Sequence, residues 1–383
     1  MTAPPFRIAC PTAIHFGAGT ADNIAAVLPK TDGAIVLVRG ASGAASASVS
    51  AQVHRTAAPI VEIAVRGEPS VADINAARAA CAGHRIGALV ACGGGSVIDT
   101  GKALCFCLSH GIDLPDDFGG IDPARLATPS HLPLVALPTT AGTGAEVTAN
   151  AVLSTGRGAK TSLRGRALYP SVAIVDPTLL RGAPKHVVLS AGLDAVTQSI
   201  EAYTSCLANP FTDALTAPNV TTGLRALKAV IEAPDDTAWT NIAWTSLSSG
   251  LALANGGLGA AHGLAAVLGG GYDAPHGALC GRLLAPVLRE NQNCAPAGSD
   301  ALHKITKAMT AIADTFPPVS PDDPLSGFSA WIDAHGLPHL GAYDIERSAF
   351  DDLATASVTA SSSTKNAVPL DQPSFLRILD AAY

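Results

Sequence analysis

Residues 91–102 read Ala91-Cys-Gly-Gly-Gly-Ser-Val-Ile-Asp-Thr-Gly-Lys102, and they place a glycine-rich turn between an apolar run and a helix-like segment. The apolar run at residues 86–90 is typical of a buried strand. Three glycines permit positive φ angles and a close approach of the backbone to an anion, and the next helix would offer unpaired N–H groups. The turn therefore predicts a phosphate-binding loop, although such turns also occur for packing alone.

Apolar runs alternate with alanine-rich helical stretches on both sides of this turn. The predicted strands are 34–38, 60–65, 86–92, 132–138 and 172–175, and helical stretches between them include 72–83 and 100–108. This alternation predicts a Rossmann-like, doubly wound parallel sheet.

Beyond about residue 181 the strand signals end. Helical stretches follow at 190–205, 213–231, 237–255 and 301–314, with a proline-rich surface loop at 315–323. We therefore expect an α/β domain over residues 1–180 and an all-helical domain over residues 181–383.

The composition indicates a large interior and an unusual surface. Apolar residues make up 48% of the 383-residue chain and charged residues only 14%, which favours a homo-oligomer in which another subunit covers part of the surface. The net charge of −7 argues against nucleic acid or an anionic membrane as a partner.

The cysteines and the N-terminus favour a cytoplasmic protein. The eight cysteines form no CxxC pair and no zinc-knuckle spacing, so we expect reduced, mostly buried thiols. The opening Met1-Thr-Ala-Pro-Pro5 lacks a basic region followed by an apolar run, so no secretory signal is expected. Residues 237–272 carry no charged side chain, but their glycines and polar residues predict buried helices of a soluble domain rather than a membrane span.

A second cluster, Leu137-Pro-Thr-Thr-Ala-Gly-Thr-Gly-Ala-Glu-Val-Thr148, follows another predicted strand. Its hydroxyls and N–H groups suit the phosphates and ribose of a dinucleotide better than a metal ion. The same residues fit a capped helix start, with Thr143 as the N-cap and Glu146 at the third position. Both interpretations can hold, because a helix start is itself an anion site.

A third cluster lies in the helical half. Asp194 and Gln198 lie four residues apart, so they share one face of a predicted helix, and His262 and His276 follow. One carboxylate and two imidazoles suit a divalent ion such as Fe²⁺ or Zn²⁺, with open positions for water or substrate. Buried histidines that only form hydrogen bonds are the alternative.

The three clusters, in this order and spacing, closely resemble the iron-containing (group III) alcohol dehydrogenases. The likeness runs nearly end to end and also includes Pro11-Thr-Ala-Ile-His-Phe-Gly17, Gly67-Glu-Pro-Ser70 and Ala208-Asn-Pro-Phe-Thr-Asp-Ala-Leu215. The resemblance implies a dehydroquinate synthase-like fold, with a dinucleotide-binding domain, an all-helical metal and substrate domain, and a cleft between them. It also implies an NAD(P)-linked hydride transfer between a small alcohol and its aldehyde or ketone.

The resemblance implies specific site residues. The cofactor-binding residues would be Gly94, Gly95, Ser96, Asp99, Thr139, Thr140, Thr143, Thr148 and Lys160. Lys160 would pair with a phosphate or ribose oxygen, although it also fits a solvated surface lysine. The metal ligands would be Asp194, His262 and His276, which would also be the catalytic residues, with Gln198 at the remaining ligand position.

Three departures from the family pattern stand out. Gln198 replaces a histidine and is a weaker, neutral ligand, and Ala266 stands where a proton-relaying histidine is often found, which leaves water or a hydroxyl such as Tyr272 for that role. After the second strand the chain has Arg39 where NAD-preferring relatives often have an acidic residue. An arginine there favours the 2′-phosphate of NADP over NAD.

Three other functions remain open. A metal-independent maleylacetate reductase fits Leu268-Gly-Gly-Gly-Tyr-Asp-Ala-Pro-His276 and Gln198, but a dicarboxylate substrate needs cations that residues 237–281 do not carry. A dehydroquinate synthase-like lyase would need several Lys or Arg residues in the helical half. A non-catalytic NADP-binding protein is the third alternative.

Overall fold

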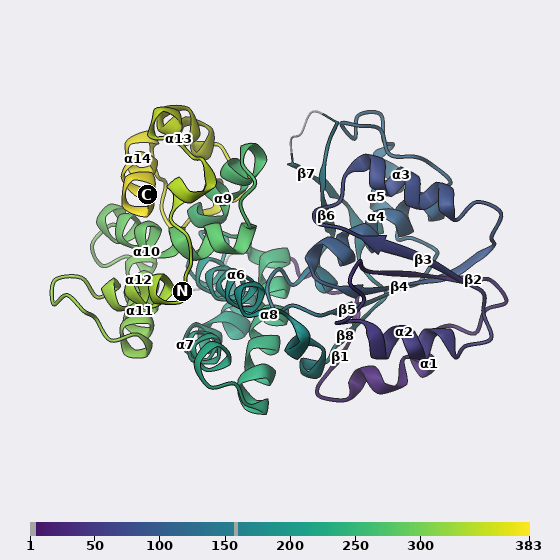
Figure 1. Ribbon diagram of the computed structural model, residues 1–383. Coiled ribbons are helices and arrows are strands. Elements are labelled where there is room, and N and C mark those ends of the chain that lie inside the picture. The colour runs from purple at the N-terminus through teal and green to yellow at the C-terminus, as the bar shows by residue number, and fades with distance from the viewer. Residues whose placement is uncertain (1–4, 157–159) are drawn as a thin grey trace. The chain divides into compact units, whose positions relative to one another are not determined.

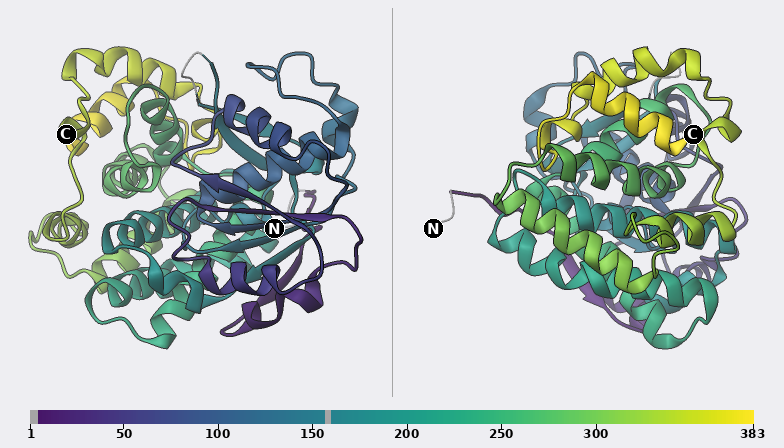
Figure 2. Two further views of the ribbon diagram at one scale, coloured as in Figure 1. Left: turned by 45° about the vertical axis from the view of Figure 1, so that its right-hand side comes forward. Right: turned by 90° about the vertical axis from the view of Figure 1, so that its left-hand side faces the viewer.

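The computed structural model describes residues 5–156 and 160–383, and the chain divides into two compact units (Figures 1 and 2). One unit is Cys10–Pro184, and the other is Lys185–Tyr383 together with the described residues before Cys10. The sequence placed the boundary at residue 180, which lies within the 3-10 helix η4 (Pro177–Gly182). Residues 5–9 were assigned to the first domain, but the Ala9 N–H donates to Asn255 Oδ1 at 2.7 Å, which ties them to the helical unit. The prediction that there is no secretory signal was made from residues 1–5. Of these, residues 1–4 lie outside the described residues.

The α/β unit is built on a six-stranded sheet of order β1-β8-β5-β4-β2-β3, in which every neighbouring pair is parallel. Its strands are β1 (Ala13–Phe16), β2 (Ala34–Gly40), β3 (Ile60–Val65), β4 (Ile86–Gly93), β5 (Leu134–Pro138) and β8 (Val172–Val175). The chain runs from β2 to β3 on one side and, after β4, to β5 on the other, so the carboxyl ends of β2 and β4 flank a topological switch point.

Both faces of this sheet are covered, as the apolar strand sequences predict. Successive side chains of β2 enter different layers: Ile35 and Leu37 pack with α2 (Ala47–His54), and Val36 and Val38 pack with α3 (Val71–Ala80) and α4 (Gly95–His110). Figure 1 shows α1 (Ile24–Val27) and α2 on one face of the sheet and α3 and α4 on the other. The predicted doubly wound α/β fold is confirmed.

The remaining elements of this unit are short. They are η1 (Thr20–Asn23), α5 (Pro123–Ala127), η2 (Ala145–Val147), β6 (Asn150–Ser154), β7 (Lys160–Arg164) and η3 (Arg166–Leu168). Strands β6 and β7 pair antiparallel in a two-stranded ribbon that the sequence did not predict. Strand β7 has the sequence Lys160-Thr-Ser-Leu-Arg164, in which four of the five residues are polar or charged. It therefore lacks the apolar run that identified the predicted strands.

The second unit is helical throughout its described secondary structure. In chain order its helices are α6 (Lys185–Thr204), α7 (Pro210–Glu232), α8 (Asp236–Gly256), α9 (Ala260–Gly271), α10 (His276–Cys294), α11 (Asp300–Thr315), α12 (Ser326–Ala334), η5 (Leu340–Tyr343), η6 (Arg347–Ala349), α13 (Phe350–Val358), η7 (Ser363–Lys365) and α14 (Gln372–Ala382). Across the described ranges, no single helix has the length and apolar composition needed to cross a bilayer. Helices α8 and α9 meet both criteria only together, and the chain bends by 94° between them.

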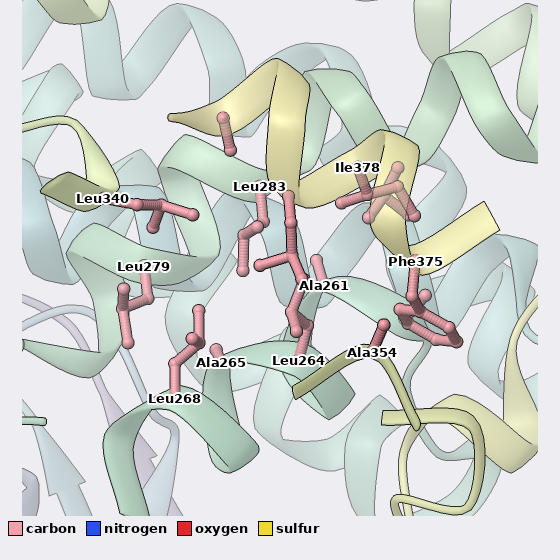
Figure 3. Packing of buried hydrophobic residues seen from close by; sticks show 14 of the residues in the cluster. Ala261, Leu264, Ala265, Leu268, Leu279, Leu283, Leu340, Ala354, Phe375 and Ile378 are labelled. Carbon is pink, nitrogen blue, oxygen red and sulfur yellow. The ribbon is translucent and has the colours of Figure 1, made fainter. Parts of the chain in front are cut away.

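An apolar cluster fixes α9 against α10 and the C-terminal helices (Figure 3). Leu264 and Leu268 of α9 pack with Leu283 of α10 and with Phe375 of α14. All four side chains are fully or almost fully buried. This packing holds the first turns of α9 and α10, which carry His262 and His276, in a fixed relation to each other.

Candidate metal centre and glycine-rich turn

Four possible metal ligands converge in the helical unit. One ligand atom from each of Asp194, His262, His276 and Cys280 lies within 4.8 Å of all the others. Asp194 Oδ1 lies 3.2 Å from His262 Nε2 and 3.9 Å from His276 Nε2, and Cys280 Sγ lies 3.6 Å from His276 Nε2. Donors bound tetrahedrally to one ion at ordinary bond lengths lie about 3.3 to 3.6 Å apart. The cluster therefore fits a single divalent ion.

Close packing of α10 on α6 brings these residues together. A Cβ at Gly277 would lie 3.0 Å from the Cβ of Asp194, and one at Gly281 would lie 2.6 Å from a methyl group of Leu193. Only glycine fits at either contact, so the two glycines on one face of α10 set the distance to α6. Cys280 lies between them in the sequence, one helical turn after His276.

A second carboxylate orients His262. Glu201 Oε2 lies 2.6 Å from His262 Nδ1, and Glu201 Oε1 accepts the Ala261 N–H at 2.6 Å. A carboxylate beside Nδ1 accepts the ring proton of that nitrogen, so Nε2 is the ring nitrogen that a metal ion beside Asp194 would bind. Glu201 is buried at the N-terminus of α9, where the unpaired N–H groups of the helix favour negative charge.

The cluster is electrostatically coupled. Burial alone would raise the pKa of the Cys280 thiol, but the neighbouring charges of His262 and His276 lower it overall. Burial likewise opposes ionisation of Asp194, and the hydrogen bond from His262 and the charge of His276 hold the pKa of Asp194 below its usual value. The charge of Cys280 raises the pKa of His276 to about 9. The site thus favours the ionised forms of Asp194 and Cys280 beside a protonated His276.

Gln198, expected at a ligand position, contacts Asp194 and Ser249. Its amide donates to the Asp194 carboxylate, while its Oε1 accepts from the Ser249 hydroxyl at 3.4 Å. Ala266 is exposed, and the ring of Tyr272 packs against the apolar cluster of α9 and α10. Proton delivery by Tyr272 stays a prediction.

Sequence reasoning missed Cys280 and Glu201. Cys280 was interpreted as one of several buried thiols, and it is indeed buried and free. The spacing of four residues after His276 on a helix was the available signal. Glu201 follows Asp194 by seven residues on α6, so both lie on the same face of that helix. The contact of α9 with this face results from tertiary packing, which the sequence pattern does not indicate.

In the α/β unit, the glycine-rich turn faces the threonine-rich segment. Cβ atoms at Gly94 and Gly95 would lie 3.3 Å from Thr140 Oγ1 and 3.1 Å from Thr143 Oγ1. Gly95 begins α4, so the first N–H groups of this helix, including that of Ser96, point toward the space between the two segments. The two segments are therefore in near contact, which glycine permits, and the dipole of α4 favours an anion at the start of this helix.

A buried lysine supports the threonine-rich segment from behind. Lys102 is fully buried, and its Nζ donates to the Ala145 carbonyl at 2.8 Å and lies 3.2 Å from Thr148 Oγ1. Asp99 Oδ1 lies 3.1 Å from the same Nζ, and Asp99 Oδ2 accepts the Val152 N–H at 2.9 Å. Asp99 and Thr148, expected to bind cofactor, are thus engaged within this network. Thr139 is also buried.

Ionisable groups in this network are strongly affected by burial. Burial raises the pKa of Glu146 to about 7, with Lys102 opposing the shift. Burial also lowers the pKa of Lys102 and raises that of Asp99, although each partially stabilises the charge of the other.

Two expected cofactor-binding cations are held by carboxylates. Arg39 Nε and Nη2 lie 2.9 and 2.7 Å from Glu62 Oε2. Lys160 Nζ lies 2.7 Å from Glu68 Oε2. Arg39 pairs in register with Cys92 of β4, so it lies at the switch point beside the glycine-rich turn, whereas Lys160 lies on the antiparallel ribbon.

Comparisons with known proteins agree with this architecture. A family model for iron-containing alcohol dehydrogenase matches residues 11–177, and one for the C-terminal part of the Fe-containing alcohol dehydrogenase family matches residues 188–383. The chain is 36% identical to probable alcohol dehydrogenase EutG of Escherichia coli (strain K12) over 59% of its own length and 57% of EutG. It therefore spans little more than half the length of that relative.

Two further similarities extend over more of the chain. Alcohol dehydrogenase 4 of Saccharomyces cerevisiae (strain YJM789) is 30% identical over 76% of this chain and 78% of that protein. A solved structure of 1,3-propanediol oxidoreductase has a TM-score of 0.85 and 26% identity, covering 99% of this chain and 100% of the other.

Proposed function

Since the chain belongs to the iron-containing alcohol dehydrogenase family, we propose that it is a metal-dependent, NAD(P)-linked dehydrogenase of small alcohols. It would interconvert an alcohol and the corresponding aldehyde or ketone. The α/β unit would bind the dinucleotide, and the helical unit would bind the metal ion and the substrate.

The convergence of Asp194, His262, His276 and Cys280 is the observation that carries this proposal. Asp194, His262 and Cys280 are buried, whereas the His276 side chain is 40% exposed. Since only His276 is partly exposed, a small molecule could reach an ion held by these donors from the side of His276. When bound, the ion would polarise the substrate oxygen and the nicotinamide would exchange the hydride.

The chain's own residues prepare the site. Asp194 supplies negative charge, and Gln198 restrains its carboxylate through a hydrogen bond. Glu201 fixes the tautomer of His262. Gly94 and Gly95 let the backbone at the start of α4 approach Thr140 and Thr143 closely, and the first turn of α4 would receive the phosphates.

We further propose a preference for NADP(H). Arg39 lies at the carboxyl end of β2, beside the strand that leads into the glycine-rich turn, where a ribose 2′-phosphate would be recognised. Glu62 holds the same guanidinium, so it would weaken this preference without removing it.

A small, weakly polar substrate is the class that this chain favours. Residues 237–281 contain no Lys or Arg. The next cation, Arg282, is buried and donates to the Asp333 carboxylate and the Pro338 carbonyl, so it is engaged elsewhere. A dicarboxylate substrate, as for a maleylacetate reductase, finds no support in these contacts. The names of relatives that act on propanediol or other alcohols point the same way.

Metal analysis combined with cofactor oxidation tests the proposal. Protein purified without chelator should contain one metal ion per chain and oxidise NADPH or NADH with short aldehydes. Asp194→Asn and His276→Ala should lose metal and activity together. Activity that survives complete metal removal would exclude the metal-dependent mechanism and favour the metal-independent reductase.

We also propose that the protein is cytoplasmic and forms a homo-oligomer. All eight cysteines are free, which suits a reducing, cytoplasmic compartment. Leu207 and Val319 are exposed apolar side chains of the helical unit, as a homo-oligomer interface would require.

A further inference from the structure

We propose that Cys280 is the fourth protein ligand of the metal ion, in place of an imidazole at position 198, and that the resulting site prefers Zn²⁺ to Fe²⁺. This inference rests on the metal-dependent function proposed above. It names the group that completes the donor set and the metal that this set selects.

The distances around Cys280 support direct ligation. Its Sγ lies 3.6 Å from His276 Nε2, the separation expected for a sulfur and a nitrogen on one tetrahedral ion. The same atom lies within 4.8 Å of the donor atoms of Asp194 and His262. Small side-chain rotations therefore suffice to bring all four donors to bonding distance.

Cys280 lies on the part of α10 that packs closely against α6. Gly281 packs against Leu193 of α6, and Gly277 packs against Asp194, so the face of α10 between them is pressed onto α6. Cys280 is fully buried on this face. Cys280 borders the apolar cluster of α9 and α10, but its Sγ lies within 4.8 Å of the donor atoms of two imidazoles and a carboxylate, which are groups that bind metal ions. Cys105, by contrast, packs with Leu104, Leu134 and Val97, and its thiol donates to the Leu132 carbonyl.

The contacts of Gln198 favour a supporting role over ligation. Its Oε1, the atom of the amide that could bind a cation, accepts from the Ser249 hydroxyl at 3.4 Å. Its amide nitrogen donates to Asp194. Gln198 is therefore a positioning residue for Asp194.

A thiolate changes which metal the site selects. Two anionic donors, the carboxylate and the thiolate, neutralise a divalent ion in buried surroundings. Thiolate is a soft ligand that suits Zn²⁺, and Zn²⁺ also binds nitrogen and sulfur sites more tightly than Fe²⁺ does. Replacing an imidazole by a thiolate therefore shifts the selectivity of the site toward zinc.

Cobalt substitution tests the ligation without relying on activity. Metal-free protein is loaded with one equivalent of Co²⁺, and its absorption spectrum is recorded. Wild-type protein should show a sulfur-to-cobalt charge-transfer band in the near ultraviolet. Cys280→Ser should lose this band. Cys294→Ser is the matched control, since Cys294 ends the same helix but is exposed, and it should keep the band.

Competition between metals tests the selectivity. Cys280→Ser should bind Zn²⁺ roughly 10- to 100-fold more weakly in chelator competition, the range seen when groups supporting a metal are removed. Its Fe²⁺ affinity, measured without oxygen, should fall less, so the Zn²⁺/Fe²⁺ ratio should decrease.

The outcomes separate this inference from the proposed function. If Co²⁺ binds wild-type protein without a charge-transfer band, or if Cys280→Ser keeps the band, Cys280 is not a ligand. The metal-dependent function survives that result provided that Asp194→Asn loses Co²⁺. If wild-type protein takes up no Co²⁺ at all, both proposals fail. The wild-type spectrum decides the ligation even if a variant does not fold.

Discussion

Glu201 Oε2 and His262 Nδ1 lie 2.6 Å apart, and the carboxylate also accepts the backbone N–H of Ala261. One buried side chain of α6 thus controls both the ring of His262 and the start of the helix that carries it.

Removing the charge of Glu201 should weaken metal binding. A glutamine has one acceptor oxygen where the carboxylate has two, so it cannot hold both the His262 ring and the Ala261 N–H. We expect Glu201→Gln to lower Zn²⁺ affinity roughly 10-fold or more, as measured by chelator competition. Glu346→Gln, an exposed carboxylate of the same unit, is the control. Equal affinities in the two variants would show that Glu201 only caps α9.

A histidine at position 198 should compensate for loss of the thiol. Gln198 follows Asp194 by one turn and contacts it, so an imidazole there can reach the same ion. We expect Gln198→His to restore Zn²⁺ affinity in the Cys280→Ser background and to change it less in wild-type protein. Additive effects in this double-mutant cycle would contradict a shared ligand position.

Cofactor preference should depend on the pair of Arg39 and Glu62. Glu62→Gln frees the guanidinium, so the ratio of kcat/KM for NADPH over NADH should rise roughly 10-fold, as for one added charged hydrogen bond. Arg39→Asp should lower the ratio. Asp32→Asn, which disrupts the exposed pair of Arg85 and Asp32, is the matched control. A ratio unaltered by both changes would exclude the proposed 2′-phosphate contact.

Glu146 should make stability depend on pH. Burial raises its pKa from 4.5 to about 7, so the folded protein keeps a proton that the unfolded chain loses in this window. The free energy of unfolding should therefore fall by about 3 kcal/mol as the pH rises from 4.5 to 7. Glu146→Gln removes this titration. Its melting temperature should exceed that of wild type by several degrees at pH 8 and by little at pH 5. A difference independent of pH would contradict the prediction.

A methyl group in the glycine-rich turn should impair dinucleotide binding. A Cβ at Gly95 would lie 3.1 Å from Thr143, so it would push the two segments apart at the start of α4, where the phosphates are proposed to bind. We expect Gly95→Ala to raise the Kd for NADPH at least 10-fold, roughly the cost of losing one charged hydrogen bond. Zn²⁺ affinity is the internal control and should not change. Unaltered NADPH binding would place the dinucleotide elsewhere.

The large features of the fold were predictable because each is encoded locally. The five predicted strands are mostly apolar, with Glu62 in the edge strand β3 as an exception, and four predicted helices of the second half coincide with α6, α7, α8 and α11. Strand β1 and the ribbon of β6 and β7 were missed, since four or five residues of mixed polarity carry little periodic signal.

The site was predictable only in part. Asp194, His262 and His276 were recognised by residue type and spacing, and the structure brings them together. The participation of Cys280 depends on how closely two glycines let α10 approach α6, which no local pattern encodes. Likewise, the carboxylates that hold Arg39 and Lys160 come from neighbouring strands or distant loops.

The ammonium of Lys102 has a consequence for how a nucleotide would enter. It connects the helix after the glycines to the carbonyl of Ala145, so both sides of the proposed phosphate site are joined by one buried side chain. A ligand arriving there need not organise the two sides, and the entropy that such ordering costs is already lost during folding. Fast exchange of cofactor is compatible with this connection, because neither entry nor departure requires the two sides to rearrange.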